Sequence, residues 1–197
     1  MKFEYPEGAT PLDEDYRQDL IPDIQLQMEL NEFEQRNIVE AILWAQDNKS
    51  FSRILLSPQG VCELHRRMFH LTWRWAGKYR RRNTNIGVEW SEIAENVILV
   101  CQDTEFWIEN KVHYWNELAV RFHHRLVKVH PFPNGNGRHA RLAADLLHGF
   151  HGQSSLSWGG THLAENGEAR DEYMAGLKEA DQNSYGRLIR FAISGRE

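Results

Sequence analysis

The residues best suited to chemistry lie in one short segment, which runs from His130 to Arg141 and reads HPFPNGNGRHAR. Its two prolines predict the end of a helix, because proline lacks a backbone N–H and disfavours helix in the residue before it. Gly135 and Gly137 allow backbone N–H groups to approach a ligand closely and permit unusual dihedral angles. The segment therefore predicts a loop between two helices that can bind a ligand through its backbone.

The start of the following helix has the properties of an anion site. Asn136 stands where that helix begins, and a helix N-terminus after a glycine-containing loop offers unpaired N–H groups and a positive dipole end. Arg138 and Arg141 are three residues apart, so they share a helix face and could clamp the oxygens of a polyphosphate. His130 ends the preceding helix and can take a proton near neutral pH. These residues favour a phosphate cradle with a general base at its rim over a plain helical corner with a capping Asn and solvated arginines.

Hydrophobic periodicity predicts helices along most of the chain, and these must position the segment. The first begins at Asn31, where Glu34 stands three residues on as a capping-box partner. The others are expected over about 61–71, from Ser91 onward, and over 114–129, 136–148, 168–180 and 183–194. Residues 77–90 contain glycines, asparagines and scattered β-formers, which predict an irregular loop with a short β-hairpin. The sequence thus predicts an all-α fold of six to eight helices.

The first thirty residues differ from the rest of the chain. They are acidic and hold three of the six prolines, which predicts an extended arm over 1–30 before a single helical domain over 31–197. No stretch approaches the roughly 20 apolar residues of a membrane helix, and the N-terminal residues lack the apolar core of a secretory signal. Cys62 and Cys101 cannot form a disulfide framework, so a reducing cytosol is the expected location.

Composition and charge argue against two other kinds of site. A net charge of −5 means that a nucleic-acid-binding protein would need a local basic patch. The run 78–82 (KYRRR), near Trp73 and Trp75, is one short patch that also suits the rim of a nucleotide or target site, so nucleic-acid binding is not expected. His123 and His124 are adjacent on a predicted helix and point apart, so no zinc site is expected there, and both are predicted to lie at the surface or core edge.

The segment from His130 to Arg141 resembles the signature of Fic-domain proteins, His-Pro-Phe-x-Asp/Glu-Gly-Asn-Gly-Arg-x-x-Arg. It departs from that signature at Asn134, where the family has an acid. Upstream, the letters MF at 68–69 and WRWAGKYR at 73–80 are similar to the family's segment leading into its target-docking flap. Three further stretches look like the subfamily called mobile mystery protein B, namely 8–13 (GATPLD), 30–32 (LNE) and 156–160 (LSWGG). The resemblance covers nearly the whole chain and implies a single Fic-like helical domain.

The resemblance implies a protein adenylyltransferase, which moves AMP from ATP to a Ser, Thr or Tyr hydroxyl of a target protein and releases pyrophosphate. His130 would be the general base. Three residues would hold the α- and β-phosphates through backbone N–H groups and the Asn side chain, namely Gly135, Asn136 and Gly137. Arg138 would neutralise the leaving pyrophosphate, and Arg141 would meet the γ-phosphate. The intact glycine–arginine pair separates the chain from kinase-like relatives that bind ATP reversed.

The remaining roles implied by the resemblance concern the target and the loop itself. Phe132 would anchor the loop in the core. A flap would hold the target segment by strand-like main-chain pairing, and its residues are Thr84, Asn85, Ile86, Gly87 and Val88. Removal of AMP, which some relatives perform, stays open.

Asn134 matters because the family's acid holds the Mg²⁺ that bridges the α- and β-phosphates. An Asn side chain offers an oxygen ligand without charge, whereas Mg²⁺ prefers carboxylate and phosphate oxygens. We therefore expect a slower or more Mg²⁺-demanding enzyme. The alternative is a nucleotide-binding regulatory protein with weak or lost transferase activity.

The sequence leaves open whether either of two segments or a separate partner controls such an activity. The stretches 91–96 (SEIAEN) and 161–166 (THLAEN) match the letters of the family's inhibitory helix, although helix capping gives the same letters. The subfamily resembles the toxin half of a two-gene module, which implies a helix-turn-helix-like antitoxin partner and a bacterial cytoplasmic location. The target protein, the natural inhibitor and the oligomeric state are not fixed by the sequence.

Overall fold

The helices carry the whole architecture of the chain. The computed structural model describes residues 14–160, 163 and 167–194, and over these residues it contains eight α-helices and one isolated β-bridge. The α-helices are α1 (Glu14–Arg17), α2 (Gln27–Asp47), α3 (Pro58–Phe69), α4 (Ile93–Glu109), α5 (Trp115–Val129), α6 (Asn136–Phe150), α7 (Glu168–Asp181) and α8 (Gly186–Ile193). Three short 3₁₀ turns accompany them, η1 (Phe51–Arg53), η2 (Trp90–Glu92) and η3 (Trp158–Gly160). The all-α prediction is confirmed.

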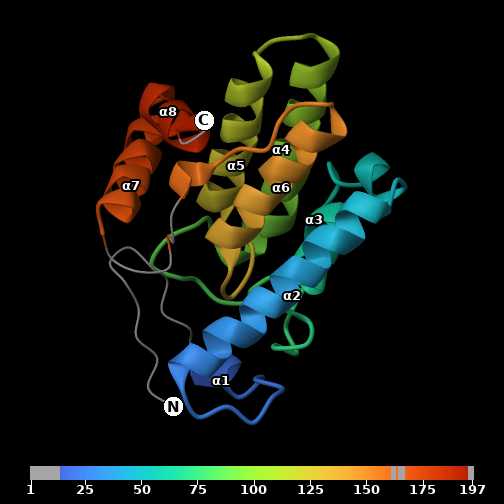
Figure 1. The fold of residues 1–197 in the computed structure, drawn as a ribbon, viewed down its shortest axis with the longest axis vertical. Coiled ribbons are helices and arrows are strands. Elements are labelled where there is room, and N and C mark those ends of the chain that lie inside the picture. Colours follow the sequence, from blue (N-terminus) through green and yellow to red (C-terminus); the bar gives the residue numbers. More distant parts are fainter. Residues whose placement is uncertain (1–13, 161–162, 164–166, 195–197) are drawn as a thin grey trace.

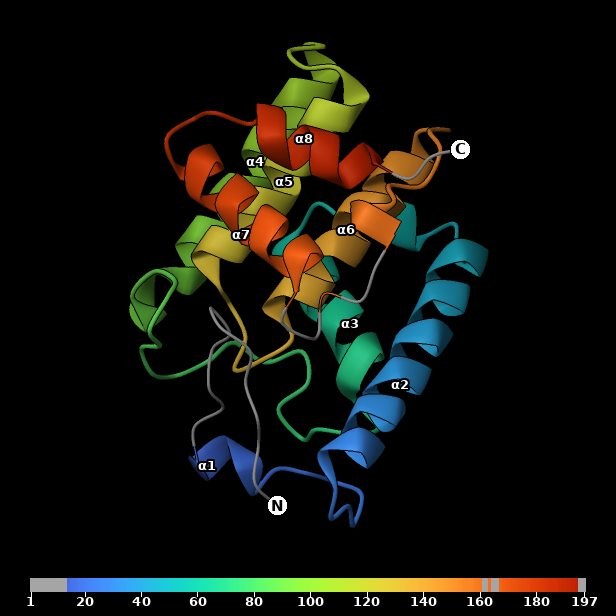
Figure 2. The ribbon, with the colours of Figure 1, turned by 60° about the vertical axis from the view of Figure 1, so that its left-hand side comes forward.

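Helices α5 and α6 form the centre of the molecule, with α2 along one side and α7 and α8 on the opposite side (Figures 1 and 2). Small side chains allow the central pair to pack closely, since Ala119, Ala140, Ala143 and Ala144 are all 0% exposed. The loop between α5 and α6 is therefore held at one end of the most deeply buried pair of helices.

Local signals fix the start of α3 and of α2. Ser57 caps α3 by accepting a hydrogen bond from the Gly60 N–H at 3.0 Å, and Pro58 follows in the first helical position. The first predicted helix, which was expected to begin at Asn31, corresponds to α2. That start is wrong, because α2 begins four residues earlier at Gln27. Glu29 supplies the cap by accepting from the Leu26 N–H at 3.0 Å.

The described part of the predicted N-terminal arm is α1, an irregular segment over 18–26 and the first turn of α2, while residues 1–13 lie outside the described residues. This part runs beside the segment 72–75. The Ile21 N–H donates to the Thr72 carbonyl, and the Arg74 N–H donates to the Asp19 carbonyl, both at 2.9 Å. The Trp75 indole N–H donates to the Tyr16 carbonyl at 3.2 Å.

No helix in the described part of the chain is long and apolar enough to cross a membrane.

The predicted β-hairpin is wrong: residues 77–89 contain no strand. The reason is the side chain of Arg80, which is only 1% exposed. Its guanidinium donates to the carbonyls of Arg82 (2.7 Å) and Val88, which lie on the two limbs of the loop. Because these carbonyls bond to the guanidinium, the two limbs are joined through a buried side chain rather than by strand pairing.

We expect the protein to lose stability as the pH falls below about 6.5. His139 donates from Nε2 to the Val61 carbonyl at 3.0 Å where α6 meets α3, and burial lowers its pKa to about 4. The unfolded chain binds a proton on this ring below about pH 6.5, whereas the folded chain keeps the ring neutral. The contribution of His139 to stability is therefore complete above that pH and falls by on the order of 1 kcal/mol per pH unit as the pH decreases toward 4.

Urea midpoints measured between pH 7 and 5 check this expectation, with His139→Gln as the variant that lacks the titrating ring. The slope against pH should be shallower in the variant. Identical slopes in the two proteins would contradict the assignment of the effect to His139.

Candidate active site

The loop between α5 and α6 is closed on itself by Asn136. Its side-chain oxygen accepts from the Phe132 N–H at 2.9 Å, and its Nδ2 donates to the Phe132 carbonyl at 2.8 Å. His130 and Gly135 provide the bends at the two ends, with φ values of 53° and 78° in the left-handed region. The Asn136 side chain therefore holds the loop closed. The backbone N–H groups at the start of α6 are the candidate anion site.

Phe132 is fully buried and stacks on the ring of His65, with ring centroids 3.7 Å apart. His65 is 0% exposed and joins three segments. Its Nδ1 accepts from the Gly77 N–H at 2.9 Å, so its Nε2 carries the proton and donates to the Asn134 carbonyl at 3.1 Å. Burial lowers the pKa of His65 well below its usual value, which keeps the ring in this neutral form.

His130 lies at the end of α5 and is 6% exposed. Burial, followed by the positive charge of Arg80, lowers the pKa of His130 to about 4. The ring is therefore neutral at pH 7, which is the form that a general base needs before it accepts a proton.

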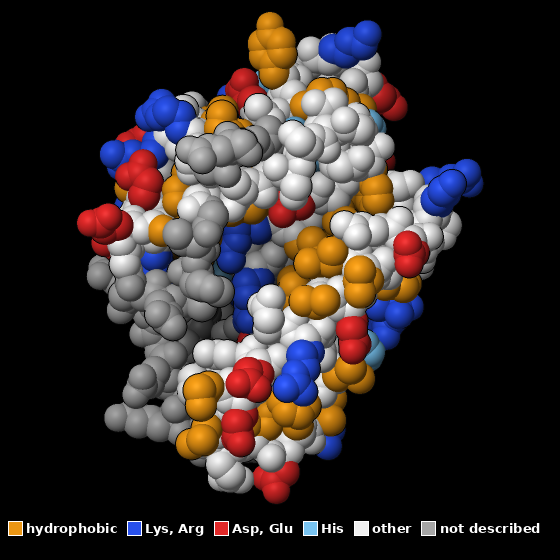
Figure 3. Space-filling model, in the orientation of Figure 1, with side chains coloured by type: hydrophobic (Ala, Val, Ile, Leu, Met, Phe, Trp, Pro, Cys, Tyr) orange, Lys and Arg blue, Asp and Glu red, His pale blue; other side chains and the backbone are white. Residues whose placement is uncertain are grey.

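The two motif arginines, Arg138 and Arg141, lie in the first turns of α6 and have different neighbours. A Cβ on Gly137 would lie 3.6 Å from Nη1 of Arg141 and 3.9 Å from the Tyr173 hydroxyl, so both groups stand beside the first turn. The guanidinium of Arg141 lies over the Tyr173 ring at 5.4 Å, and that of Arg138 lies over the Phe69 ring at 4.9 Å. Figure 3 shows a hollow on this face with Lys and Arg side chains inside it. The cradle is thus lined by cations, as a polyphosphate site requires.

A buried carboxylate contacts one of these arginines. Glu34 of α2 is 5% exposed and accepts from Nη1 of Arg138 at 2.6 Å and from the Trp73 indole N–H at 2.7 Å. The expected role of Glu34 as a helix cap is therefore wrong. Sequence reasoning missed the ion pair because its partners are 104 positions apart. The carboxylate orients Arg138 and offsets part of its charge.

The surroundings of Asn134 bear on a metal ion. Its side-chain oxygen accepts from the Gly135 N–H at 2.7 Å and lies 3.4 Å from Nη2 of Arg138. This single neutral oxygen stands next to a guanidinium, and the described residues include no group of three or more His, Cys, Asp or Glu side chains that could hold a metal. These residues do not fit a divalent cation held by the protein's own side chains.

The flap residues Thr84 to Val88 lie against the predicted base. A Cβ on Gly87, whose φ is +104°, would stand 2.7 Å from the Cβ of His130, so only glycine fits there. The Val88 N–H donates to the Val129 carbonyl at 3.4 Å. Arg80 completes the junction through a hydrogen bond from Nε to the His130 carbonyl at 2.7 Å. The structure thus brings the flap, the loop and the cradle to one end of the central helix pair.

Several other expectations meet the structure differently. Arg80 is buried, so the basic run 78–82 is not a continuous exposed patch. His123 and His124 are 0% and 4% exposed, which corrects their expected place at the surface or core edge. The stretch 91–96 spans the end of η2 and the first turn of α4, and most of 161–166 lies outside the described residues. In the described part of the chain, the carboxylate that contacts a motif arginine belongs to Glu34.

Comparison with solved structures defines the class of fold. The N-terminal Fic domain of Bep8, an effector protein from Bartonella sp. 1-1C, gives a TM-score of 0.67 at 17% identity and covers 88% of both chains. BepC from Bartonella tribocorum, solved with bound AMPPNP, gives a TM-score of 0.64 at 17% identity over 95% of this chain and 92% of that one. Fic-1 from C. elegans gives 0.64 at 24% identity over 88% of this chain and 50% of that one. At these identities the likeness establishes the fold, which is that of a Fic domain.

Comparisons of the sequence also find similarity to Fic proteins. Residues 55–148 match the Fic/DOC family. The protein adenylyltransferase Fic of Drosophila mojavensis is 26% identical over 144 residues, which is 71% of this chain and 27% of that protein. The Drosophila erecta protein of the same name is 32% identical over 100 residues, 48% of this chain and 20% of that protein. The chain thus spans between a fifth and just over a quarter of these relatives. The chain is thus similar to the Fic/DOC family over residues 55–148, and its distant relatives are named as protein adenylyltransferases.

We expect Glu34→Ala to lower the free energy of unfolding by about 2 kcal/mol, because it leaves the Trp73 N–H and the Arg138 guanidinium without their shared acceptor. Glu32→Ala on the same helix is the matched control. Glu32 pairs with Arg36 at 3.5 Å with both side chains more than 60% exposed, so its loss should change stability by less than about 1 kcal/mol. Urea unfolding measures both variants. Equal and small effects would contradict a structural role for the buried pair.

Proposed function

We propose that the protein is a Fic-type adenylyltransferase that moves AMP from ATP to a Ser, Thr or Tyr hydroxyl of a target protein. The observation that carries the proposal is the short loop between α5 and α6, which has the neutral ring of His130 at one end and the first turn of α6, with Arg138 and Arg141, at the other. The family match over residues 55–148 supports the reaction class.

In the proposed reaction His130 accepts the proton of the target hydroxyl as its oxygen attacks the α-phosphorus in line. The bond between the α-phosphorus and the bridging oxygen to the β-phosphate breaks, and pyrophosphate leaves with that electron pair. The N–H groups of Gly135, Asn136 and Gly137 stabilise the α- and β-phosphates. Arg138 neutralises the pyrophosphate and Arg141 meets the γ-phosphate.

The remaining parts of the proposal follow from the same site. Phe132 anchors the loop, and the flap residues Thr84–Val88 hold the target segment through its main chain. Mg²⁺ would belong to the substrate as a complex with ATP, because phosphate oxygens are its preferred ligands and Asn134 would supply at most one neutral oxygen. The sequence resemblance and patterns alone support four further parts of the proposal. These are a helix-turn-helix-like antitoxin partner, membership of the mobile mystery protein B subfamily, a bacterial cytoplasmic location and the division into an arm and a helical domain.

A second candidate function is a nucleotide-binding regulatory protein with little transferase activity. Two observations favour it, since Asn134 replaces the family's acid and Glu34 already engages Arg138. This candidate keeps nucleotide binding at Arg138 and Arg141 but does not need His130.

Incubation with a cell lysate, Mg²⁺ and ATP labelled at either the α- or the γ-phosphate separates the two functions. We expect protein bands labelled from the α-phosphate and not from the γ-phosphate. His130→Ala should reduce labelling by about 10²- to 10⁴-fold, because it removes the base but leaves the phosphate contacts. ATP binding by this variant, measured by calorimetry, should stay within about twofold of wild type. Label from the γ-phosphate alone, or ATP binding without any label, would contradict the transferase.

We expect Asn134→Glu to lower the Mg²⁺ concentration at which ATP binding is half-maximal, because a carboxylate is a stronger ligand for a hard cation than an amide oxygen. The measurement is a Mg²⁺ titration of ATP binding, so it does not depend on turnover. Asn134→Gln, which lengthens the side chain without adding charge, is the control. An unchanged Mg²⁺ requirement in the Glu variant would show that position 134 does not face the metal bound to the nucleotide.

A further inference from the structure

Tyr173 of α7 has no part in the reaction proposed above, yet its hydroxyl lies beside the cradle. The side chain is 4% exposed. A Cβ on Gly137, in the first turn of α6, would lie 3.9 Å from the Tyr173 hydroxyl and 3.6 Å from Nη1 of Arg141. The Arg141 guanidinium lies 5.4 Å from the centre of the Tyr173 ring. The tyrosine therefore stands next to a motif arginine at the place where phosphate groups are expected to bind.

His123 of α5 holds the Tyr173 hydroxyl from the interior of the molecule. Its Nε2 lies 3.1 Å from the Tyr173 oxygen, and its side chain is 0% exposed. Burial, followed by the positive charge of Arg141, lowers the pKa of His123 well below its usual value, so the ring is neutral at pH 7. A neutral imidazole can accept a hydrogen bond at the nitrogen that carries no proton.

Hydrogen bonds join Arg141, Tyr173 and His123 into a chain. Burial raises the pKa of Tyr173, whereas the charge of Arg141 and a hydrogen bond from its guanidinium oppose that rise. A guanidinium carries only N–H donors, so the Tyr173 oxygen accepts from Arg141 and its own proton is left to donate to Nε2 of His123. The chain thus leads from the core side of α5 to the guanidinium at the cradle.

Arg141 differs from Arg138 in what holds its guanidinium. The Glu34 carboxylate holds Arg138 at 2.6 Å, whereas no ion pair of Arg141 is found in the described part of the chain. A neutral hydroxyl orients a guanidinium without offsetting its charge, so the full charge remains for a phosphate. Because a long side chain loses rotamer freedom when it binds a ligand, an arginine that is already ordered binds at a lower entropic cost.

We propose that Tyr173 and His123 are positioning residues that direct Arg141 at the terminal phosphate and so make the site select a nucleoside triphosphate over a diphosphate. The proposal rests on the proposed function, in which Arg141 meets the γ-phosphate, and adds to it the residues that set this specificity. A diphosphate ends one phosphate short of Arg141, so its affinity should not depend on the Tyr173 hydroxyl.

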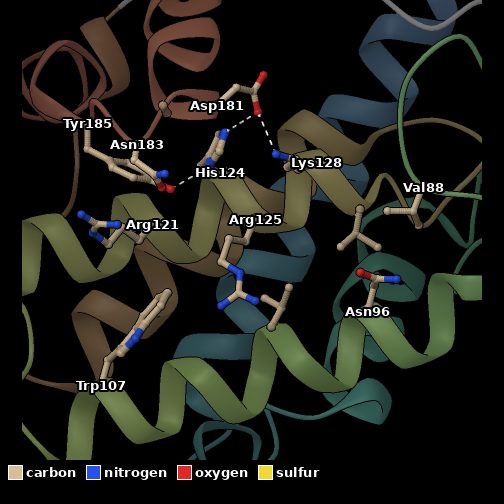
Figure 4. A pocket seen from close by; sticks show the side chains of 13 residues that line it. Val88, Asn96, Trp107, Arg121, His124, Arg125, Lys128, Asp181, Asn183 and Tyr185 are labelled. Atoms are coloured by element: carbon tan, nitrogen blue, oxygen red, sulfur yellow. Dashed lines mark hydrogen bonds and ion pairs between the residues drawn. The ribbon is translucent and has the colours of Figure 1, made fainter.

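A second tyrosine–histidine pair of the same protein provides a matched control. The Tyr185 hydroxyl lies 3.1 Å from Nδ1 of His124, and the Arg121 guanidinium lies 4.0 Å from the centre of the Tyr185 ring. Figure 4 shows these three side chains together in a pocket between α4, α5 and the turn from α7 to α8. Arg121 donates to Glu117 at 2.9 Å and is not part of the motif. This trio therefore has the same side-chain types without a role in the proposed phosphate site.

The test compares Tyr173→Phe with Tyr185→Phe in the full chain, since each substitution removes one hydroxyl and keeps the ring. We expect Tyr173→Phe to weaken the binding of ATP in the presence of Mg²⁺ by about 3- to 10-fold, because the nucleotide must then order Arg141 itself. The affinity of the same variant for ADP should stay within about twofold of wild type, as should both affinities of Tyr185→Phe. Calorimetry measures all of these affinities.

Substitution of Arg141 separates positioning from general stability. In an Arg141→Ala background, Tyr173→Phe should cause no further loss of ATP affinity, because both substitutions remove the same interaction. His123→Leu, which removes the acceptor of the Tyr173 hydroxyl, should show the same selective loss for ATP. Unchanged ADP binding verifies the folding of each variant. In the AMP-transfer assay, Tyr173→Phe should raise the KM for ATP and leave kcat unchanged.

Each other outcome is decisive. Equal losses of ATP and ADP affinity in Tyr173→Phe, or a loss that persists in the Arg141→Ala background, would overturn the proposal in favour of a structural role. Full ATP affinity in Tyr173→Phe would overturn it whether or not AMP is transferred. A selective loss of ATP affinity, with no transfer of α-labelled AMP by the wild-type chain, would support the positioning role and contradict the transferase. A wild-type chain that binds neither nucleotide would overturn both.

Discussion

The hydrogen bonds that close the loop between α5 and α6 are the constraint on which the site depends. Asn136 bonds to both polar groups of the Phe132 backbone, and the buried ring of His65 bonds to the Asn134 carbonyl while it stacks on Phe132. These bonds satisfy backbone groups that would otherwise be buried without partners. The first N–H groups of α6 follow directly on this closed loop, so an anion that binds them needs no reorganisation of the loop.

Charge balance in the cradle is the second feature that distinguishes this chain. Arg138 is held by the buried carboxylate of Glu34, whereas Arg141 rests on the face of Tyr173. A phosphate at Arg138 therefore shares the guanidinium with a fixed carboxylate, but one at Arg141 does not. Asn134 stands where the family motif has an acid, so the loop itself carries no carboxylate. The carboxylate beside the motif arginines comes instead from α2.

Arg80 links the site to the surface that would receive a target. Its buried guanidinium bonds to carbonyls at His130, Arg82 and Val88, so the flap and the base share one support. Burial, followed by the same positive charge, lowers the pKa of His130 and keeps its ring neutral at pH 7.

The sequence by itself determined the helical class, most helix positions and the cluster from His130 to Arg141, because those features depend on local periodicity, proline and glycine, and on residues close in the chain. It did not determine the start of α2 at Gln27 or that residues 77–89 form no hairpin. Both depend on which partner a side chain finds: Glu29 caps its own helix, and Arg80 bonds to the two limbs of the loop. The roles of His65 and Glu34 were decided only by the tertiary structure. These contacts join residues far apart in the sequence, and only burial in a shared core brings them within hydrogen-bonding distance.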